Sequence, residues 1–471
     1  MTNWLPDLSA GTGPLYMRLA DTIEHDISGG VLPAGAKLPP QRDLAYDIGV
    51  TIGTVGRAYA LVRERGLVSG EVGRGTFVLG RDHVEPVTAP APSRQSEKPA
   101  IDVAPSPKLR MDSTSAPDVG QSAVVENLIA GITKAHPFEL IDYTRNWPRH
   151  WREAGSRWLA HGDWKPEPQN VVPTLGVHAA VMAVISAITV PGDKVVFERL
   201  TYSSISRSVN LIGRRSIIVG SDEQGCDPDD FERLCAQQHP KIAFLMPSIQ
   251  NPTLGVMSLE RRKAIAEIAR KYNVWLIEDS IYGVMLKEQP PLLVSFAPER
   301  TFHVGGLSKA VSAGVRAGWV ACPSHLAPRV QTAHKMVTGG MPFLLAELAA
   351  QLVNAGHADT IRAKVREEIA VREAAAREIL DGYEFASNPA APFLWLKLPE
   401  PWLSTTFKNA AANEGVLVDD EDEYKPGRTE QTFHRTRIGF TSVPTRADAL
   451  RGFSTLRRLL DNACAGYDSF G

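Results

Sequence analysis

Apolar and polar residues alternate with a helical period over the first part of the chain. The apolar positions that recur every fourth residue are Leu15, Leu19, Ile23 and Ile27. They predict an amphipathic helix over residues 14–28, which a pair of glycines ends. A second short helix is expected over residues 38–48 and a third over 52–65, which Thr51 can cap. Apolar pairs on either side of a glycine-rich turn within residues 67–78 predict a hairpin. Three helices followed by a two-stranded hairpin are the plan of a winged helix-turn-helix.

From residue 121 onward, apolar segments with the length of strands alternate with segments of helical period. The strand-like segments are residues 194–198, 216–219, 242–246, 274–278, 301–304 and 318–321. The helical segments between them are residues 178–187, 203–212, 227–238 and 259–272. Because such alternation is typical of a parallel sheet covered on both faces, we expect an α/β fold with a mostly parallel sheet. A small α/β subdomain is expected over about residues 383–471, with strands at 393–398 and 437–441 and helices at 402–413 and 445–461.

Residues 81–120 separate these two regions. Their prolines are Pro86, Pro90, Pro92, Pro99, Pro105, Pro107 and Pro117. A segment with so many prolines and so few large apolar residues cannot bury enough surface to fold, so we expect an extended linker. The predicted organisation is a first domain over residues 1–80, a linker over 81–120 and a second domain over 121–471.

The composition is that of a globular protein, with 43% hydrophobic and 22% charged residues among 471 and a net charge of −2. This length predicts two or three domains. Over residues 1–80, seven Lys and Arg face eight Asp and Glu, so nonspecific attraction to phosphate is expected to be modest. The four cysteines lack CxxC spacing and give no metal-site signal. We see no signal peptide, and the longest apolar stretch, residues 179–190, is too short to span a bilayer, so a cytoplasmic protein without a membrane partner is expected.

Polar side chains follow three of the predicted strands. Asn251 follows the third strand, Asp279 and Tyr282 follow the fourth, and Lys309 follows the fifth. Binding groups gather at the carboxyl ends of parallel strands, so these side chains should share one edge of the sheet. Taken singly, each has an ordinary interpretation as a turn residue, a helix cap, core packing or a solvated amine. Lys309 lies in a turn of small residues, neither on a polar helix face nor in a charged loop, and one explanation is an amine joined to an aldehyde cofactor. For a single lysine a solvated side chain is the more common outcome, and the residues that accompany Lys309 are what favour the cofactor. The successive spacings of 28, 30 and 7 residues, the last to Arg316, fit one chemical apparatus.

The N-terminal region resembles the GntR-type DNA-binding domain along its whole length. The residues that carry the resemblance are Pro14-Leu15-Tyr16, Gly35, Leu38-Pro39, Arg42, Leu44-Ala45, Gly49-Val50-Thr51, Thr54-Val55, Ala58-Tyr59, Gly66-Leu67, Gly73 and Gly75-Thr76-Phe77-Val78. The resemblance implies that Arg42 meets backbone phosphate of double-stranded DNA. It also implies groove-facing positions on the third helix for Thr51, Thr54 and Arg57, and a wing tip at Arg74 and Gly75. Ile52 stands where the family usually has an arginine.

From about residue 121 to 464, the chain resembles the fold-type I aminotransferases, which bind pyridoxal 5'-phosphate. The resemblance implies that Lys309 forms the internal aldimine with this cofactor. Asp279 would pair with the pyridinium nitrogen. Tyr282 and Asn251 would bond the 3'-oxygen of the ring, and Tyr202 would stack on its face.

The same resemblance implies a phosphate site and a carboxylate site. Arg316 would grip the cofactor phosphate with two hydrogen bonds. Further phosphate contacts would come from Gly176, Val177 and His178, which precede a helix, and from Ser308. Gly306 stands where the family usually has a second phosphate-binding serine, so one contact is missing. Arg437 would hold the carboxylate of a substrate or effector, and Arg435 is its local competitor.

Taken together, the two regions and the linker resemble the MocR subfamily of bacterial transcription regulators. The resemblance implies a homodimer in which the body senses an amine or amino-acid effector by aldimine exchange at Lys309 and so alters the binding of an operator by the heads. A working aminotransferase with a vestigial head remains open, because imine chemistry needs the same residues. A regulator that no longer binds the cofactor is a third possibility. The sequence does not determine the effector, the operator, the sign of regulation or whether transamination is completed.

Overall fold

The computed structural model describes residues 4–6, 8, 13–71, 75–79, 108–288, 290–427, 429 and 431–462. The chain divides into two compact units, Met1–Asp102 and Val103–Gly471. We call them the head and the body, and each is described by itself. No helix in the described ranges is long and apolar enough to cross a membrane.

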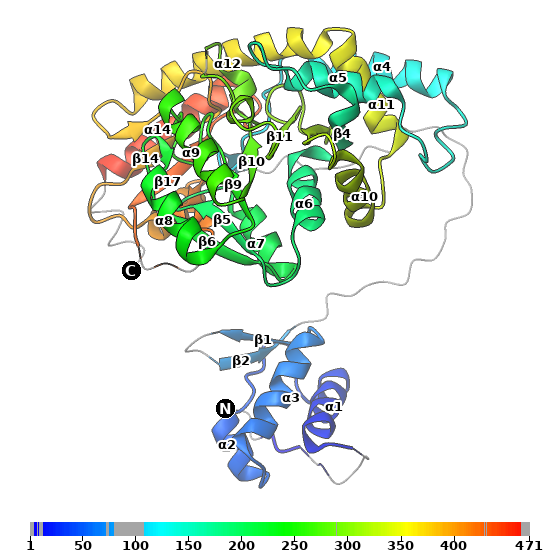
Figure 1. Cartoon of the computed structure of the whole chain (residues 1–471). Coiled ribbons are helices and arrows are strands. Elements are labelled where there is room, and N and C mark those ends of the chain that lie inside the picture. Colours follow the sequence, from blue (N-terminus) through cyan, green and yellow to red (C-terminus); the bar gives the residue numbers. More distant parts are fainter. Residues whose placement is uncertain are drawn as a thin grey trace, which may run out of the picture. The chain divides into compact units, whose positions relative to one another are not determined.

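The head contains three helices and a hairpin (Figure 1). The elements are α1 Leu15–Ser28, α2 Gln41–Asp47, α3 Ile52–Glu64, β1 Val68–Glu71 and β2 Gly75–Val78, with β1 and β2 antiparallel. Leu19 and Ile23 are fully buried, as the apolar period predicts. Thr51 caps α3, because its Oγ1 accepts a hydrogen bond from the backbone N–H of Thr54 at 3.2 Å. The predicted winged helix-turn-helix is confirmed.

The body is built on a seven-stranded sheet with the order β4-β12-β11-β10-β9-β5-β6. Its strands are β4 Val171–Thr174, β5 Lys194–Glu198, β6 Arg215–Val219, β9 Ile242–Leu245, β10 Trp275–Asp279, β11 Thr301–Gly306 and β12 Gly318–Ala321. Neighbours among β11, β10, β9, β5 and β6 are parallel, whereas β12 runs antiparallel to both β11 and β4. The mostly parallel sheet is confirmed, and β4 was not among the predicted strands.

Helices cover both faces of this sheet. The helices of this part of the body are α4 Gln121–Ala135, α5 Arg149–Leu159, α6 Gly176–Ile188, α7 Ser203–Leu211, α8 Pro228–Gln238, α9 Leu259–Lys271, α10 Ala327–Thr338, α11 Phe343–Asn354 and α12 His357–Ile379, of which α4 and α12 pack against other helices. Side chains alternate along each strand, so Val195 and Phe197 pack in the core beneath α6 and α7, whereas Val196 packs beneath α8 and α9. Short elements connect these parts: η1 Pro168–Asn170, β7 Ser221–Asp222, β8 Gly225–Cys226, η2 Gly283–Met285 and η3 Leu293–Ser295.

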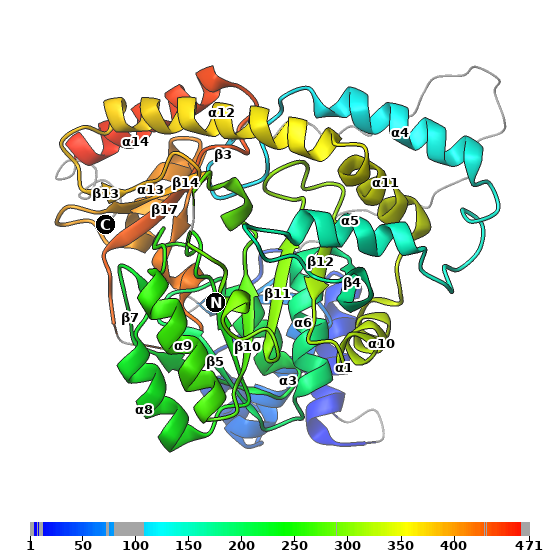
Figure 2. The same ribbon diagram turned by 45° about the horizontal axis from the view of Figure 1, so that its top comes forward.

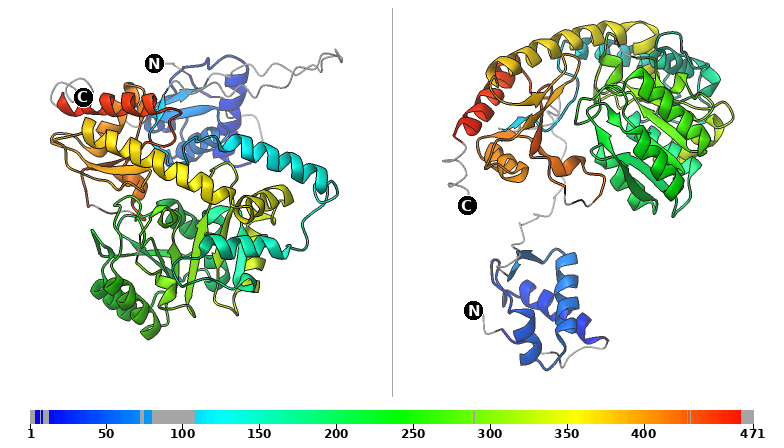
Figure 3. Two further views of the ribbon diagram at one scale, coloured as in Figure 1. Left: turned by 90° about the horizontal axis from the view of Figure 1, so that it is seen from above. Right: turned by 60° about the vertical axis from the view of Figure 1, so that its left-hand side comes forward.

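The C-terminal part of the body forms a second, smaller sheet with the order β13-β14-β17-β16. Its strands are β13 Phe385–Ala386, β14 Phe393–Lys397, β16 Asp419–Asp420 and β17 Arg435–Gly439, and beside them lie α13 Ser404–Asn413, η4 Glu421–Tyr424 and α14 Arg446–Asp461. Helix α12 runs from the large sheet to this subdomain and packs along α14 (Figures 2 and 3).

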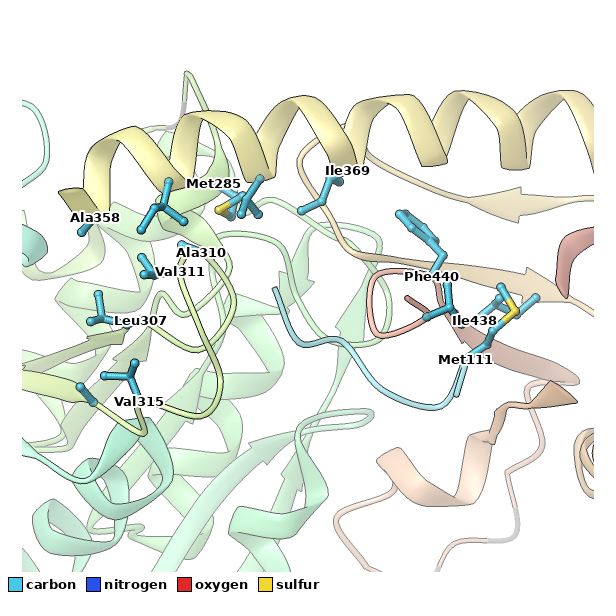
Figure 4. Packing of buried hydrophobic residues seen from close by; sticks show 14 of the residues in the cluster. Met111, Met285, Leu307, Ala310, Val311, Val315, Ala358, Ile369, Ile438 and Phe440 are labelled. Carbon is cyan, nitrogen blue, oxygen red and sulfur yellow. The ribbon is translucent and has the colours of Figure 1, made fainter. Parts of the chain in front are cut away.

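The structure corrects the expected end of the linker. Within the predicted linker, β3 Leu109–Arg110 pairs in parallel with β15 Val416–Leu417 of the body. Met111 is fully buried beside Ile438 (Figure 4), and a Cβ on Gly452 of α14 would lie 2.3 Å from its sulfur. Residues 108–120 therefore belong to the body, because Leu109 and Met111 pair with and pack against its subdomain, which the count of prolines does not reveal. The rest of the predicted linker, residues 81–107, lies outside the described residues.

Candidate functional site

The carboxyl ends of β9, β10 and β11 border a cavity of about 340 Å³. All eleven residues of the body that the sequence nominated line it: Gly176, Val177, His178, Tyr202, Asn251, Asp279, Tyr282, Ser308, Lys309, Arg316 and Arg437. The structure thus brings together side chains that are up to 261 positions apart in the chain. Their assigned roles at the cofactor stay predictions.

Lys309 is held inside the pocket instead of extending into solvent. Its Nζ donates a hydrogen bond to Thr114 Oγ1 at 2.8 Å and lies 5.7 Å from the centre of the Tyr282 ring. The hydroxyls of Thr114 and Tyr282 are also hydrogen-bonded at 2.8 Å. This three-residue network points the amine at the cavity, where it can react with an aldehyde.

Asp279 is a buried carboxylate whose ionisation depends on the pocket. Burial raises its pKa to about 7, although His303 and Lys309 act in the opposite direction. One carboxylate oxygen accepts the backbone N–H of Ile281 at 2.9 Å. A cationic group in the cavity would favour the charged form, so this site fits a protonated ring nitrogen.

The neighbouring carboxylate, Glu278, projects to the other side of β10. It accepts backbone N–H groups of Leu293 and Val294 at 2.8 and 3.0 Å, and it pairs with His303 at 3.1 Å. Burial acts to raise the pKa of Glu278, but His303, the charge of Arg262 and the N–H of Val294 hold it below its ordinary value. Since successive side chains on a strand face opposite sides, Asp279 faces the pocket and Glu278 does not.

One end of the cavity suits a phosphate. Gly176 begins α6 with φ +82°, and the free N–H groups of this helix end carry partial positive charge. Arg316 adds a full positive charge there. Burial, and after it the charge of Arg316, lowers the pKa of His178. An anion of two charges is therefore well matched.

The glycine in place of the family's second serine has a packing reason. A Cβ on Gly306 would lie 2.7 Å from the carbonyl oxygen of Ala317 and 3.2 Å from a methyl group of Val177. Gly318, which pairs with Gly306 across β11 and β12, is similarly crowded. Position 306 therefore carries no hydroxyl, because the neighbouring backbone lies too close for a side chain.

The opposite end of the cavity holds Arg437. Its Nη1 donates to Asn251 Oδ1 at 3.0 Å, and its Nη2 forms an ion pair with Asp419 at 2.7 Å. Arg435, the competitor, instead pairs with Glu384 at 2.8 Å and does not line the cavity. Residues two apart on a strand face the same side, so the two arginines are separated by their positions along β17: Arg437 lies opposite Asp419 of β16, whereas Arg435 is the first residue of β17.

Sequence reasoning missed several residues of the pocket wall. Asp112, Ser113 and Thr114 come from the segment assigned to the linker, and Asp419 and Tyr424 come from an acidic segment of the subdomain. Alternating apolar residues at Leu109 and Met111 were the available signal for the first group. Nothing local marked Asp419, because its partner is 18 residues away.

In the head, the nominated residues lie on the helix surfaces. Arg42 is exposed in the first turn of α2, and Thr51 and Arg57 are exposed at the N-terminal half of α3 with Thr54 half-buried between them. A shallow hollow is lined by Leu15, Tyr16, Thr51, Gly53, Thr54 and Arg57. Gly75 begins β2, whereas Arg74 lies outside the described residues.

Comparisons with known proteins agree with both units. A family model described as "Aminotransferase class I and II" matches residues 150–444, and one described as "Bacterial regulatory proteins, gntR family" matches residues 15–78. An uncharacterized HTH-type transcriptional regulator of Bacillus subtilis, YdeF, is 27% identical over 98% of this chain and 97% of its own. Another, YdcR of Escherichia coli, is 24% identical over 89% of this chain and 94% of its own. The crystal structure of an archaeal alanine:glyoxylate aminotransferase has the same fold, with a TM-score of 0.68 and 24% identity over 75% of this chain and 91% of its own.

Proposed function

Because this chain belongs to the aminotransferase class I and II family and joins that body to a GntR-type DNA-binding head, as MocR-type transcription regulators do, we propose that its body senses an amine or amino acid and thereby changes how the head binds DNA. The cofactor of such a body is pyridoxal 5'-phosphate, and the pocket has the donors that this group needs. When bound, it supplies an aldehyde that reacts reversibly with primary amines and a ring that withdraws electrons.

Each part of the cofactor has a partner in the chain. Lys309 would hold the aldehyde carbon, and Asp279 would keep the proton on the ring nitrogen. The N-terminus of α6 and Arg316 would bind the phosphate. Tyr282 would donate its hydroxyl proton toward the oxygen of the ring. The other nominated contacts would position the ring and the phosphate: Tyr202, Asn251, Gly176, Val177, His178 and Ser308.

The observation that carries the sensing proposal is the contact between Lys309 and Thr114. Thr114 stands at the end of the segment that leads from the head into the body, and its hydroxyl bonds Lys309 at 2.8 Å. An effector amine that takes the place of Lys309 at the cofactor changes what this lysine can bond. The change would therefore alter the contacts of residues 108–120, the part of the body that follows the predicted linker in the chain. A ligand shifts an equilibrium only through such differential contacts.

The test is DNA binding to the upstream region of the gene, measured by fluorescence anisotropy of the full-length protein with cofactor and with a panel of amines and amino acids. At least one amine or amino acid of the panel should change the apparent Kd of the protein for this DNA severalfold. In Thr114→Val this response should shrink while the visible spectrum of the cofactor stays. Thr133→Val, on the exposed face of α4, is the matched control and should respond like wild type. Absence of a specific DNA complex with and without cofactor would reject the proposal.

The second candidate function is catalysis of transamination. The complete set of amine, buried carboxylate and phenol around the cavity favours it, because a working enzyme needs the same groups. Release of a keto acid from an amino acid, together with pyridoxamine phosphate, would support the enzyme. A spectral change without these products would support the sensor.

We also propose that the body is a homodimer. Phe138, Ile141 and Tyr143 follow α4 with side chains 78%, 84% and 85% exposed, which is unusual for three large apolar residues so close together. A second copy of the chain would cover them. Light scattering should give twice the monomer mass, and Ile141→Asp should reduce it. Val190→Asp, at an isolated exposed residue, is the control.

A further inference from the structure

The guanidinium of Arg437 is already engaged within the chain. Its Nη1 donates to Asn251 Oδ1 at 3.0 Å, and its Nη2 donates to Asp419 Oδ2 at 2.7 Å and to the carbonyl oxygen of Asp112 at 3.1 Å. Both edges by which a guanidinium can grip a carboxylate with two hydrogen bonds include Nη2. Nε is buried and has no hydrogen-bond partner among the described residues, but one N–H cannot make a two-pronged contact.

The ion pair between Arg437 and Asp419 is built into the small sheet. The two residues are directly opposite each other in the antiparallel pairing of β16 with β17. Thr436 Oγ1 donates to the carbonyl oxygen of Asp419 at 2.7 Å, and the hydroxyl of Tyr424 donates to the same carboxylate oxygen that Arg437 uses. Backbone register and a second donor thus hold the carboxylate in place.

Aromatic rings hold the arginine from two sides. The centre of the guanidinium lies 4.9 Å from the centre of the Tyr424 ring and 5.3 Å from that of Phe393. The side chains of Arg437 and Asp419 are 8% and 18% exposed, so water screens their attraction weakly. Moving Asp419 away from Arg437 would leave the buried guanidinium without a partner, which costs much free energy.

Two further arginines near the cavity, Arg207 and Arg110, are also paired with acids and so offer no spare positive charge. Glu423 lines the cavity and pairs with Arg207 at 3.1 Å, and Asp112 pairs with Arg110 at 2.8 Å. A carboxylate that enters from solution therefore meets an arginine already neutralised by a tethered carboxylate. A tethered group competes at a high effective concentration, so a free one displaces it poorly.

We propose that the ligand of this pocket is a primary amine without a carboxylate on the carbon next to its amino group, and that Asp419 is the residue that excludes α-amino acids. This inference rests on the proposed function and specifies its ligand class. Asp419 occupies, from within the chain, the place that the carboxylate of an amino acid would take on Arg437.

The first test uses two probes that differ only in a carboxylate, butylamine and 2-aminopentanoate. Full-length protein loaded with pyridoxal phosphate is titrated with each, and the visible absorbance of the cofactor gives an apparent Kd. Wild type should bind butylamine at least tenfold more tightly. In Asp419→Asn the apparent Kd of 2-aminopentanoate should fall at least tenfold, whereas that of butylamine should stay within about twofold. Glu423→Gln, which removes another carboxylate of the same cavity, is the matched control and should behave like wild type.

A second test is independent of amine sensing. Pentanoate has a carboxylate and no amine, and it should raise the Tm of Asp419→Asn but leave that of wild type unchanged. Each protein is compared with its own ligand-free sample, and Asp419→Ser serves if Asp419→Asn folds poorly. Equal stabilisation of wild type and variant by pentanoate overturns the inference, as does wild-type preference for 2-aminopentanoate. If no amine changes the spectrum of the loaded protein, the sensing proposal fails while the pentanoate comparison still decides the role of Asp419.

Discussion

The pocket of the body and the exposed surface of α2 and α3 in the head use charge in opposite ways. In the pocket, Asp279 is 1% exposed and Arg437 is 7% exposed, and each is surrounded by groups that set its charge or its orientation. On the head, Arg42 and Arg57 are exposed to water. Removing the partners of a buried charge costs much free energy, whereas the free energy of an exposed charge depends little on its neighbours.

This contrast separates two kinds of specificity. The pocket can discriminate small molecules with single groups, because a misplaced or unpaired charge there costs much free energy. The affinity of the head for DNA is expected to be the sum of several weak contacts, each screened by salt. Single substitutions in the pocket should therefore strongly change the binding of cofactor or ligand, whereas single substitutions in the head should change the affinity for DNA only modestly.

The sharpest expected effect is that of Lys309→Ala. Without the amine, the protein cannot hold the cofactor covalently, so borohydride treatment should leave no modified peptide and the absorbance band of the lysine adduct should be lost. Lys335→Ala, at an exposed position of α10, is the control and should retain both. A coloured, reducible adduct in Lys309→Ala would place the reactive amine elsewhere.

Next in size is the pH response of Asp279→Asn, measured by thermal unfolding without cofactor. A folded-state pKa raised from 3.8 to about 7 means that Asp279 favours folding below pH 4 and that this contribution is lost as pH rises to 7. Each unit by which the pKa of a group differs between the folded and unfolded chains changes the free energy of unfolding by about 1.4 kcal/mol. The variant should therefore be more stable than wild type at pH 8, by a margin that narrows toward pH 5. A margin independent of pH would mean that burial does not hold the carboxyl protonated.

Gly306→Ser should lower stability without improving cofactor binding. The new Cβ would lie 2.7 Å from a backbone oxygen that cannot move freely, and such overpacking costs about 1–3 kcal/mol. Gly314→Ser is the matched control, since its nearest neighbour is a side-chain oxygen at 3.9 Å. Tighter cofactor binding at unchanged Tm in Gly306→Ser would show that the turn can accommodate the serine.

The smallest effects belong to the head. Arg57→Ala should weaken operator binding about tenfold and reduce the salt dependence of the affinity by about one unit of slope. Thr51→Ala removes the cap of α3 and should cost about 1 kcal/mol of head stability. Arg63→Ala, in the last turn of α3, is the control for Arg57→Ala. A loss of operator binding in Arg57→Ala that salt does not modulate would indicate base contact instead of phosphate contact.

Local patterns predicted the elements and the polar residues at the strand ends, whereas the resemblance to known families nominated the other site residues, among them Tyr202, Ser308 and Arg437. The period of four in α1, the alternation of apolar strands with helices, and the polar residues just after strand ends are all visible in short windows of the chain. Asn251, Asp279, Tyr282 and Lys309 meet at one cavity because the parallel strands β9, β10 and β11 deliver their carboxyl ends to one edge, whereas Arg437 reaches the same cavity from the small sheet. Residues that act by pairing across the fold escaped this reasoning: Thr114 bonds a lysine 195 positions away.

The amino-acid sequence by itself determined the two-part architecture and the chemical groups of the pocket, because helical and strand periods and strand-end motifs depend on near neighbours in the chain. Only the tertiary structure decided that residues 108–120 belong to the body, that Asp279 and not Glu278 enters the cavity, and that Asp419 neutralises Arg437. These outcomes depend on register, burial and the meeting of distant segments, which no short stretch of sequence contains.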